Sequence, residues 1–224
     1  MGTLFIVATP IGNLKDITLR ALEVLKNVDL ILAEDTRVTQ KLLLKYEIKK
    51  PLWSYHQHSK LTKIEQIINE FSNGKNIALV SDAGTPGISD PGGILIQAIR
   101  EKLGNDINIV PIPGPNAAIA ALSVAGFPAD KFCFLGFPPH KKGRKTFFEN
   151  IAKTEETVVF YESKYRIEKT LTELSRVIGE RKIMVARELT KQFETIYRGT
   201  AKECLEQLKK DKILGEFAVV IKSL

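Results

Sequence analysis

A glycine- and proline-rich loop between an apolar strand and an apolar helix is the feature that most constrains this chain. Residues 81–93 read SDAGTPGISDPGG and lie between the apolar runs 77–80 and 94–99. Such a loop after a strand commonly binds a ligand in α/β proteins, because glycines leave little side chain in the way. Asp82 and Asp90 favour a ligand with donor groups or positive charge. Taken alone, the loop fits an ordinary crossover turn equally well.

Strand-like and helix-like stretches alternate along the first half of the chain, which predicts a mostly parallel α/β sheet. Continuous apolar runs of strand length lie at residues 4–8, 30–33, 77–80 and 107–112. Between the first two runs we expect a helix capped by Asp16, with Leu19, Leu22 and Leu25 on its buried side.

The second half has more strands per helix, which predicts a mixed sheet. Strand-like runs lie at residues 131–137, 157–161, 182–186, 194–198 and 216–222. Thr200 and Glu203 predict a capping box at the start of the last helix. We therefore expect two α/β domains, an N-terminal domain at 1–113 and a C-terminal domain at 114–224.

Charge and composition narrow the class of protein. The 224 residues carry a formal net charge of +7, so we expect an anionic partner, nucleic acid first. Cys133 and Cys204 show neither disulfide nor zinc spacing, which fits a reducing compartment. No run approaches the roughly 20 apolar residues of a membrane span, and the start lacks a signal-peptide pattern. We expect a cytoplasmic protein that does not bind a membrane.

Several common site motifs are absent, including the P-loop, the G-x-G-x-x-G dinucleotide fingerprint and the G-x-S-x-G elbow. His56 and His58 have no third ligand indicated, so no metal site is expected. What remains is a set of loops at strand ends. In a parallel sheet the loops after strands share one edge and can line a single crevice. These loops lie at residues 9–13, 34–37, 81–93, 113–116, 161–163 and 187–191.

Five segments resemble the ribosomal RNA small subunit methyltransferase I family, within the tetrapyrrole methylase (class III methyltransferase) superfamily. They read TPIGNL at 9–14, AEDTR at 33–37, SDAGTPGISDPGG at 81–93, PGPN at 113–116 and RELTK at 187–191. The resemblance runs in order along essentially the whole chain. It implies two α/β domains with a cofactor cleft between them, usually in a homodimer. It also implies S-adenosylmethionine as cofactor and 2′-O-methylation of a cytidine ribose in small-subunit (16S) ribosomal RNA.

The resemblance suggests a set of cofactor contacts. They are Pro10, Asp82, Gly84, Thr85, Ile88, Asn116, Ala117 and, more weakly, Glu162. Thr85 stands where many relatives have an aspartate, so we assign the cofactor ammonium to Asp82. For Asp90, the alternative to binding the cofactor is to cap the helix that follows the loop.

Methyl transfer to a hydroxyl requires that the reactants be aligned and that a proton be removed. Glu34 or Asp35 is a candidate base, with Arg37 binding phosphate. Glu188 and Lys191 are the other catalytic candidates. Structural ion pairing among these same residues is the alternative.

The sharpest run of positive charge is HKKGRK at 140–145. We expect contacts with RNA phosphates from a set of five basic residues. They are Lys141, Lys142, Arg144, Lys164 and Arg166. A solvated loop is the alternative. The family often reads YESPHR where this chain has YESKYR at 161–166, so the site keeps a basic residue but lacks the usual histidine.

The leading interpretation is therefore an S-adenosylmethionine-dependent methyltransferase acting on ribosomal RNA or on an assembled small ribosomal subunit. One alternative is a methylase of a tetrapyrrole or another small molecule on the same scaffold, which the basic charge disfavours. A second is a non-enzymatic RNA-binding module, which the intact glycine loops disfavour.

Overall fold

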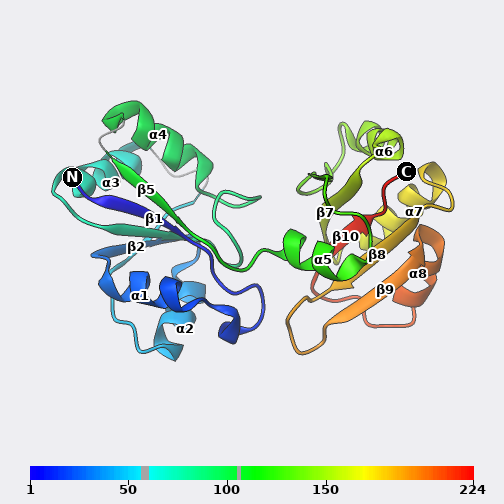
Figure 1. The fold of residues 1–224 in the computed structure, drawn as a ribbon, viewed down its shortest axis with the longest axis horizontal. Helices are drawn as coiled ribbons and strands as arrows, with labels where there is room; N and C mark the ends of the chain where they lie inside the picture. The colour runs from blue at the N-terminus through cyan, green and yellow to red at the C-terminus, as the bar shows by residue number, and fades with distance from the viewer. Residues whose placement is uncertain (57–60, 105–106) are drawn as a thin grey trace. The chain divides into compact units, whose positions relative to one another are not determined.

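A computed structural model describes residues 1–56, 61–104 and 107–224 of the chain. The chain folds into two compact units, Met1–Asn116 and Ala117–Leu224. The boundary expected from the sequence, after residue 113, falls just before this division. Each unit is built on its own five-stranded sheet (Figure 1).

The sheet of the first unit has the strand order β3-β2-β4-β1-β5. Every pair of neighbouring strands in it is parallel, which confirms the prediction from the apolar runs. The strands are β1 (Thr3–Val7), β2 (Leu30–Ala33), β3 (Leu52–Ser54), β4 (Ile77–Val80) and β5 (Asn108–Ile112). The edge strand β3 was not predicted, because a three-residue, partly exposed strand leaves no continuous apolar run.

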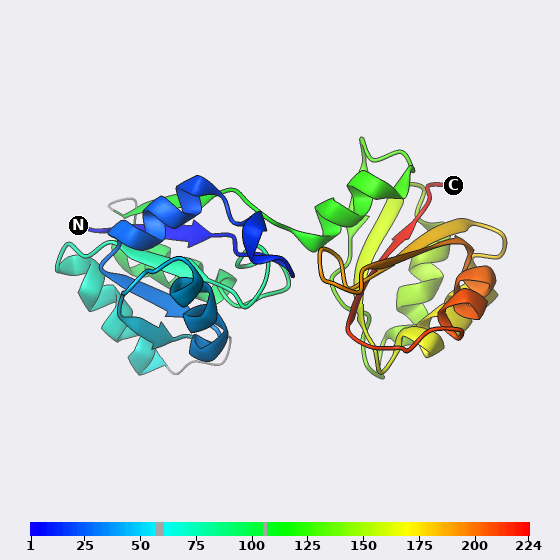
Figure 2. The same ribbon diagram turned by 90° about the horizontal axis from the view of Figure 1, so that it is seen from below.

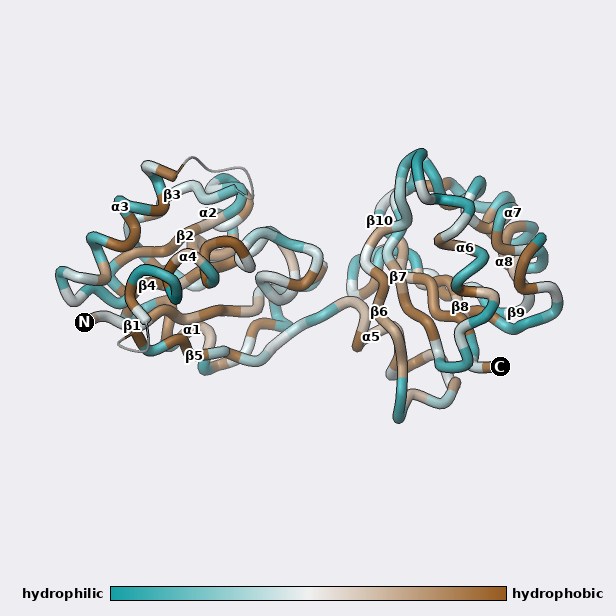
Figure 3. Tube along the Cα trace, turned by 90° about the horizontal axis from the view of Figure 1, so that it is seen from above, coloured by the Kyte–Doolittle hydropathy of each residue, from teal (hydrophilic) through white to brown (hydrophobic). Residues whose placement is uncertain are grey.

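Helices cover both faces of this sheet, as a parallel sheet requires. One face carries α1 (Leu19–Asn27) and α2 (Thr36–Lys45), and the other carries α3 (Leu61–Ser72) and α4 (Gly93–Leu103) (Figure 1). A separate apolar cluster fills the space on each face. Figure 3 shows the consequence as hydrophobic colour along the strands and hydrophilic colour on outward-facing turns of the helices.

One prediction about a helix start was wrong, and one alternative is not borne out. The cap of α1 is Thr18, whose hydroxyl accepts a hydrogen bond from the backbone N–H of Ala21, while Asp16 lies in a short 3-10 helix (Leu14–Asp16). Leu19, which was expected on the buried side of this helix, is 86% exposed. Asp90 does not cap α4, which begins after Gly92 without a side-chain cap.

The second unit has the strand order β6-β7-β10-β8-β9. β6 and β7 are parallel and the other neighbours are antiparallel, so the predicted mixed sheet is confirmed. The strands are β6 (Phe132–Phe134), β7 (Thr157–Ser163), β8 (Lys182–Arg187), β9 (Thr195–Thr200) and β10 (Glu216–Ile221).

Helices also cover both faces of the second sheet. The helix α5 (Ala117–Ala125) packs on one face, and three helices pack on the other (Figure 2). These three are α6 (Arg144–Lys153), α7 (Ile167–Val177) and α8 (Ala201–Leu208). The capping box of Thr200 and Glu203 is confirmed. No helix within the described residues has the length and apolar character needed to cross a membrane.

Candidate active site

The order of strands in the first unit creates a topological switch point at one edge of its sheet. The neighbouring strands β1 and β4 are followed by helices on opposite faces, α1 after β1 and α4 after β4. Connections that diverge in this way leave an opening beyond the carboxyl ends of the two strands, and ligands of α/β sheets bind there.

Four of the loops singled out in the sequence meet at this edge, and three of them are those after β1, β4 and β5. The backbone N–H of Thr9 donates to the carbonyl of Gly84 at 2.9 Å, and the N–H of Gly84 donates back at 3.0 Å. The buried Thr9 hydroxyl donates to the carbonyl of Ser81 at 3.0 Å. From the loop after β5, the carbonyl of Pro115 accepts the Thr85 hydroxyl at 3.2 Å. The predicted cofactor residues near Gly84 are thus brought beside Pro10, which follows Thr9.

Close approach of two backbones explains one glycine of the PGPN segment. A Cβ atom on Gly114 would lie 2.9 Å from the Cβ of Ala8, closer than real Cβ atoms come. Only glycine therefore lets the loop after β5 pack against the end of β1.

The loops after β2 and β4 are joined by reciprocal hydrogen bonds. The Asp82 carboxylate accepts the backbone N–H of Asp35 at 2.9 Å, and the backbone of Asp82 hydrogen-bonds to the Glu34 carboxylate. Asp82 is exposed and, because a carboxylate has two oxygens, it keeps acceptor capacity beyond this bond. An exposed carboxylate beside a closely packed backbone loop fits the ammonium of S-adenosylmethionine.

Glu34 and Asp35 are adjacent, but their environments push their pKa values in opposite directions. Partial burial and the negative charge of Asp82 raise the pKa of Glu34. Hydrogen bonds from the side chain and backbone of Arg37 lower the pKa of Asp35 to about 2. Asp35 also caps α2 and holds Arg37 in an ion pair at 2.6 Å. Of the two predicted bases, Glu34 is the more basic and Asp35 is structural.

Glu188 and Lys191 belong to the second unit, after β8. Their side chains form an ion pair at 2.8 Å, and Lys191 also contacts Glu216 at 3.2 Å. Burial alone would raise the pKa of Glu188, but hydrogen bonds from Lys191 and from the Glu216 N–H lower it overall. Burial alone would lower the pKa of Lys191, yet its bond to Glu188 and the charge of Glu216 raise it. A stable carboxylate and a stable ammonium are both poor bases at neutral pH.

The sequence did not reveal what holds Glu188. Gly215 has a φ of 84°, which favours glycine, and a Cβ atom there would lie 2.1 Å from the Glu188 carboxyl carbon, so a larger residue would displace that side chain. The next residue, Glu216, donates its backbone N–H to Glu188 at 3.0 Å. These residues meet only because β8 pairs with β10, a pairing that the local sequence pattern does not specify.

The structure does not support a cofactor contact for Glu162. Its side chain on β7 is 0% exposed, and its carboxylate binds Arg166 at 2.8 Å and the Thr170 hydroxyl at 2.7 Å. Arg144 approaches it at 3.8 Å. A carboxylate enclosed by two guanidinium groups is already neutralised and is not available to an ammonium.

The same contacts correct the prediction for Arg144. Arg144 is the first residue of α6, is 5% exposed and bonds to Glu173 at 2.7 Å, so it does not face an RNA phosphate. Arg166 is largely occupied by Glu162 in the same way. Lys141 and Lys142 are exposed, and Lys164 is partly exposed with its ammonium 5.0 Å from the centre of the Tyr165 ring. The local sequence could not distinguish Arg144 from its neighbours, because the helix that begins there was not predicted.

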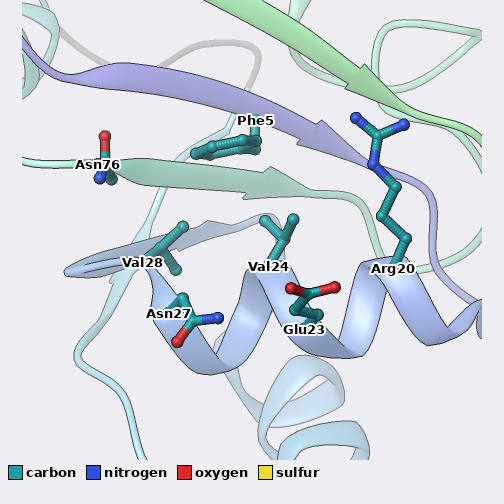
Figure 4. A pocket seen from close by; sticks show the side chains of 7 residues that line it. All are labelled: Phe5, Arg20, Glu23, Val24, Asn27, Val28 and Asn76. Atoms are coloured by element: carbon teal, nitrogen blue, oxygen red, sulfur yellow. The ribbon is translucent and has the colours of Figure 1, made fainter.

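A separate hollow of about 260 Å³ lies beside α1 (Figure 4). It is lined by Phe5, Arg20, Glu23, Val24, Asn27, Val28 and Asn76. None of these is a predicted site residue. Within residues 1–56, 61–104 and 107–224, no three His, Cys, Asp or Glu side chains are grouped to hold a metal ion. The histidine pair noted in the sequence includes His58, which lies outside the described residues.

Comparison of the chain with the sequence models of known families identifies the family to which it belongs. The sequence model of the family described as Tetrapyrrole (Corrin/Porphyrin) Methylases matches residues 3–205. The chain belongs to this family. Membership confirms the predicted fold and the predicted methyl donor, S-adenosylmethionine.

Curated relatives match nearly all of the residues of this tetrapyrrole methylase. A protein named "Ribosomal RNA small subunit methyltransferase I" from Bacillus subtilis (strain 168) is 47% identical over 99% of this chain and 75% of its own length. A protein of the same name from Thermotoga maritima is 46% identical over 99% of this chain and 98% of its own length. The one from Escherichia coli O157:H7 is 48% identical over 98% of this chain and 77% of its own length. The resemblance found in the five segments is thereby confirmed.

Solved structures of proteins with lower sequence identity share the fold. A cobalt precorrin-4 methyltransferase matches with a TM-score of 0.71 and 22% identity, over 98% of this chain and 94% of that chain. A diphthine synthase matches with a TM-score of 0.73 and 14% identity, over 99% of this chain and 90% of that chain. At these identities the similarity establishes the architecture alone.

The first prediction separates Glu34 from Asp35. Glu34→Gln should lower kcat for methyl transfer by about 10²- to 10⁴-fold, as expected for loss of a general base. Asp35→Asn should cost less, because asparagine also caps helices. In the unsubstituted protein, kcat/KM should fall as pH decreases through the raised pKa of Glu34, because protonated Glu34 cannot accept a proton. The same decrease of kcat/KM at low pH should persist in Asp35→Asn. Wild-type turnover in Glu34→Gln would contradict the assignment.

The second prediction distinguishes the role of the Glu162 carboxylate from that of the Asp82 carboxylate. Glu162→Gln should lower the free energy of unfolding by about 3 kcal/mol, because the buried Arg144 and the half-buried Arg166 lose a shared counter-charge. It should leave the affinity for S-adenosylmethionine unchanged. Asp82→Asn should weaken that affinity by about tenfold or more. Chemical denaturation and titration calorimetry measure the two effects. Weakened cofactor binding in Glu162→Gln, with Asp82→Asn unaffected, would reverse the assignment.

Proposed function

We propose that this chain transfers a methyl group from S-adenosylmethionine to the ribose 2′-hydroxyl of a cytidine in small-subunit (16S) ribosomal RNA. The observation that carries the proposal is its identity of 46 to 48%, over 98% or more of the chain, to curated ribosomal RNA small subunit methyltransferases I. The geometry of the carboxyl edge in the first unit supports it, because a partly buried carboxylate and closely packed loops meet there.

The carboxyl edge of the first sheet would hold the methyl donor. Pro10, Gly84 and Thr85 offer backbone groups of two joined loops, and Asp82 offers a carboxylate to the ammonium. Ile88 is exposed on the same loop, and Asn116 and Ala117 follow the segment that Thr85 bonds. When bound, S-adenosylmethionine supplies a methyl group that is already activated by its positively charged sulfur.

The chain's own residues must then align the hydroxyl and remove its proton. Glu34, whose pKa is raised, would accept the proton of the ribose 2′-hydroxyl as that oxygen bonds to the methyl carbon and the carbon–sulfur bond breaks, which releases S-adenosylhomocysteine. Asp35 keeps the first turn of α2 in place and orients Arg37, whose exposed guanidinium is suited to a phosphate of the substrate strand. Alignment by such contacts contributes to the rate because it removes the entropy of bringing the reactants together.

Positive charge on the second unit supports an RNA substrate. Lys141 and Lys142 are exposed in the loop before α6, and Lys164 lies beside the exposed Tyr165. Lysines bind phosphates and an exposed aromatic ring can stack on an unpaired base. We propose that the substrate is ribosomal RNA, free or in an assembled small subunit. We further propose that the protein acts in the cytoplasm as a homodimer.

The two alternative functions have less support. Small-molecule methylation rests on structural similarity at 22% identity or below, which establishes the fold alone. The RNA-binding module would need a degenerate cofactor edge, whereas the loops around Thr9 and Gly84 are closely joined.

The third prediction tests the reaction itself. Incubation with labelled S-adenosylmethionine and small ribosomal subunits from cells lacking this enzyme should label the ribose of one cytidine, located by nuclease mapping. Naked 16S RNA serves as the parallel substrate, and Glu34→Gln as the inactive control. Labelling of a tetrapyrrole but of neither RNA substrate would establish the small-molecule alternative. Failure of calorimetry to detect S-adenosylmethionine binding would favour the RNA-binding module.

A further inference from the structure

A buried ionic network in the second unit contacts the basic loop, which comprises residues 138–143. Its centre is Glu162, which is fully buried on β7 and binds Arg166 at 2.8 Å. Arg144 donates to the Thr170 hydroxyl at 2.6 Å, and that hydroxyl donates to Glu162 at 2.7 Å. Removing three charged groups from water is costly, and such networks do not by themselves indicate extra stability. The network instead holds a neighbouring loop in position.

Both arginines of the network also bind the backbone of the same loop. Arg166 donates to the carbonyl of Pro138 at 2.9 Å, and Arg144 donates to the carbonyl of Pro139 at 3.2 Å. Proline has no backbone N–H, so these carbonyls are the only main-chain groups by which the two residues can be held. The exposed Lys141 and Lys142 follow in the same loop, after His140.

The placement of Arg144 supports an inward, positioning role. It is the first residue of α6, where a positive charge is disfavoured by the helix dipole. Glu173 compensates for this with a contact at 2.7 Å, and the guanidinium also lies 5.0 Å from the centre of the Phe148 ring. The side chain is thus bound on several sides, while its sequence neighbour Lys145 is exposed.

We propose that Glu162, through Arg144 and Arg166, is a positioning residue that holds residues 138–143 against the turn at 163–166. The two segments then present Lys141, Lys142 and Lys164 together to the backbone of an RNA strand. The RNA part of this proposal rests on the proposed function, whereas the anchoring of the loop does not.

Trypsin provides a direct readout of anchoring, because it cleaves after Lys141 and Lys142 only where the loop opens. Arg144→Met should raise the rate of cleavage at these two bonds by about tenfold or more, and Arg144→Lys should raise it less. Mass spectrometry locates the cuts. Thr170→Val is a second, milder variant that removes the hydroxyl linking Arg144 to Glu162, and it should raise the same rate.

Arg181→Met is the matched control for a general loss of stability. Arg181 lies in the same unit and binds the backbone carbonyls of Ile151, Thr154 and Glu156 at 3.0, 3.0 and 3.1 Å, away from the basic loop. It should not increase cleavage after Lys141 or Lys142 relative to other sites. Equal cleavage there in Arg144→Met, Thr170→Val and the control would overturn the anchoring proposal.

RNA binding distinguishes failure of the anchor from failure of the proposed function. Lys141→Ala/Lys142→Ala should lower the slope of log affinity against log salt by roughly 0.7 to 0.9 per lost phosphate contact. Arg144→Met should lower it similarly without removing either lysine, and Arg181→Met should not. If Arg144→Met opens the loop while neither it nor the lysine variant changes the slope, the anchor stands and this surface does not bind RNA.

Discussion

Two backbone hydrogen bonds between Thr9 and Gly84 are the constraint on which the candidate site depends. They close the distance between the loops after β1 and β4, the two strands whose helices leave on opposite faces of the sheet. Because the bonds use main-chain atoms, they leave nearby side chains available for chemistry. A hydrogen bond to the Asp82 carboxylate joins the loop after β2 to these two loops. A hydrogen bond from the Thr85 hydroxyl joins the loop after β5. Four loops far apart in sequence thus form one edge.

Chemically similar carboxylates have different roles in this protein because their local contacts and burial differ. Asp35 is committed to Arg37 and to the start of α2, whereas partial burial leaves Glu34 more basic. Glu162 serves the interior of the second unit, and Glu188 is held as an anion by Lys191. A polar residue in a recurring motif can therefore have a structural task, and only its contacts separate that task from catalysis.

The sequence predicted the elements that depend on local pattern and missed those that depend on distant partners. Continuous apolar runs revealed β1, β2 and β4, because strands buried on both faces need apolar residues throughout. The start of α1 was misplaced because Asp16 and Thr18 are both acceptable caps, and burial decides between them.

In the candidate site, too, features set by the local sequence were predicted and features set by distant partners were not. The glycine loops and their shared edge followed from strand order in a parallel sheet, and the resemblance supplied the donor and substrate. The burial of Arg144 and Glu162 did not follow, because both depend on α6 and α7 packing onto β7. Charge alone made Arg144 look equivalent to Lys141, although one lies inside the unit and the other on its surface.

A crystal structure of the chain with S-adenosylhomocysteine, the demethylated form of the donor, tests the central claim most directly. We expect the ligand at the carboxyl edge of the first sheet, in contact with Pro10 and Gly84 and with its amino group at the Asp82 carboxylate. Binding in the hollow beside Phe5, or an amino group paired with Glu162, would contradict the assignment of this edge as the cofactor site.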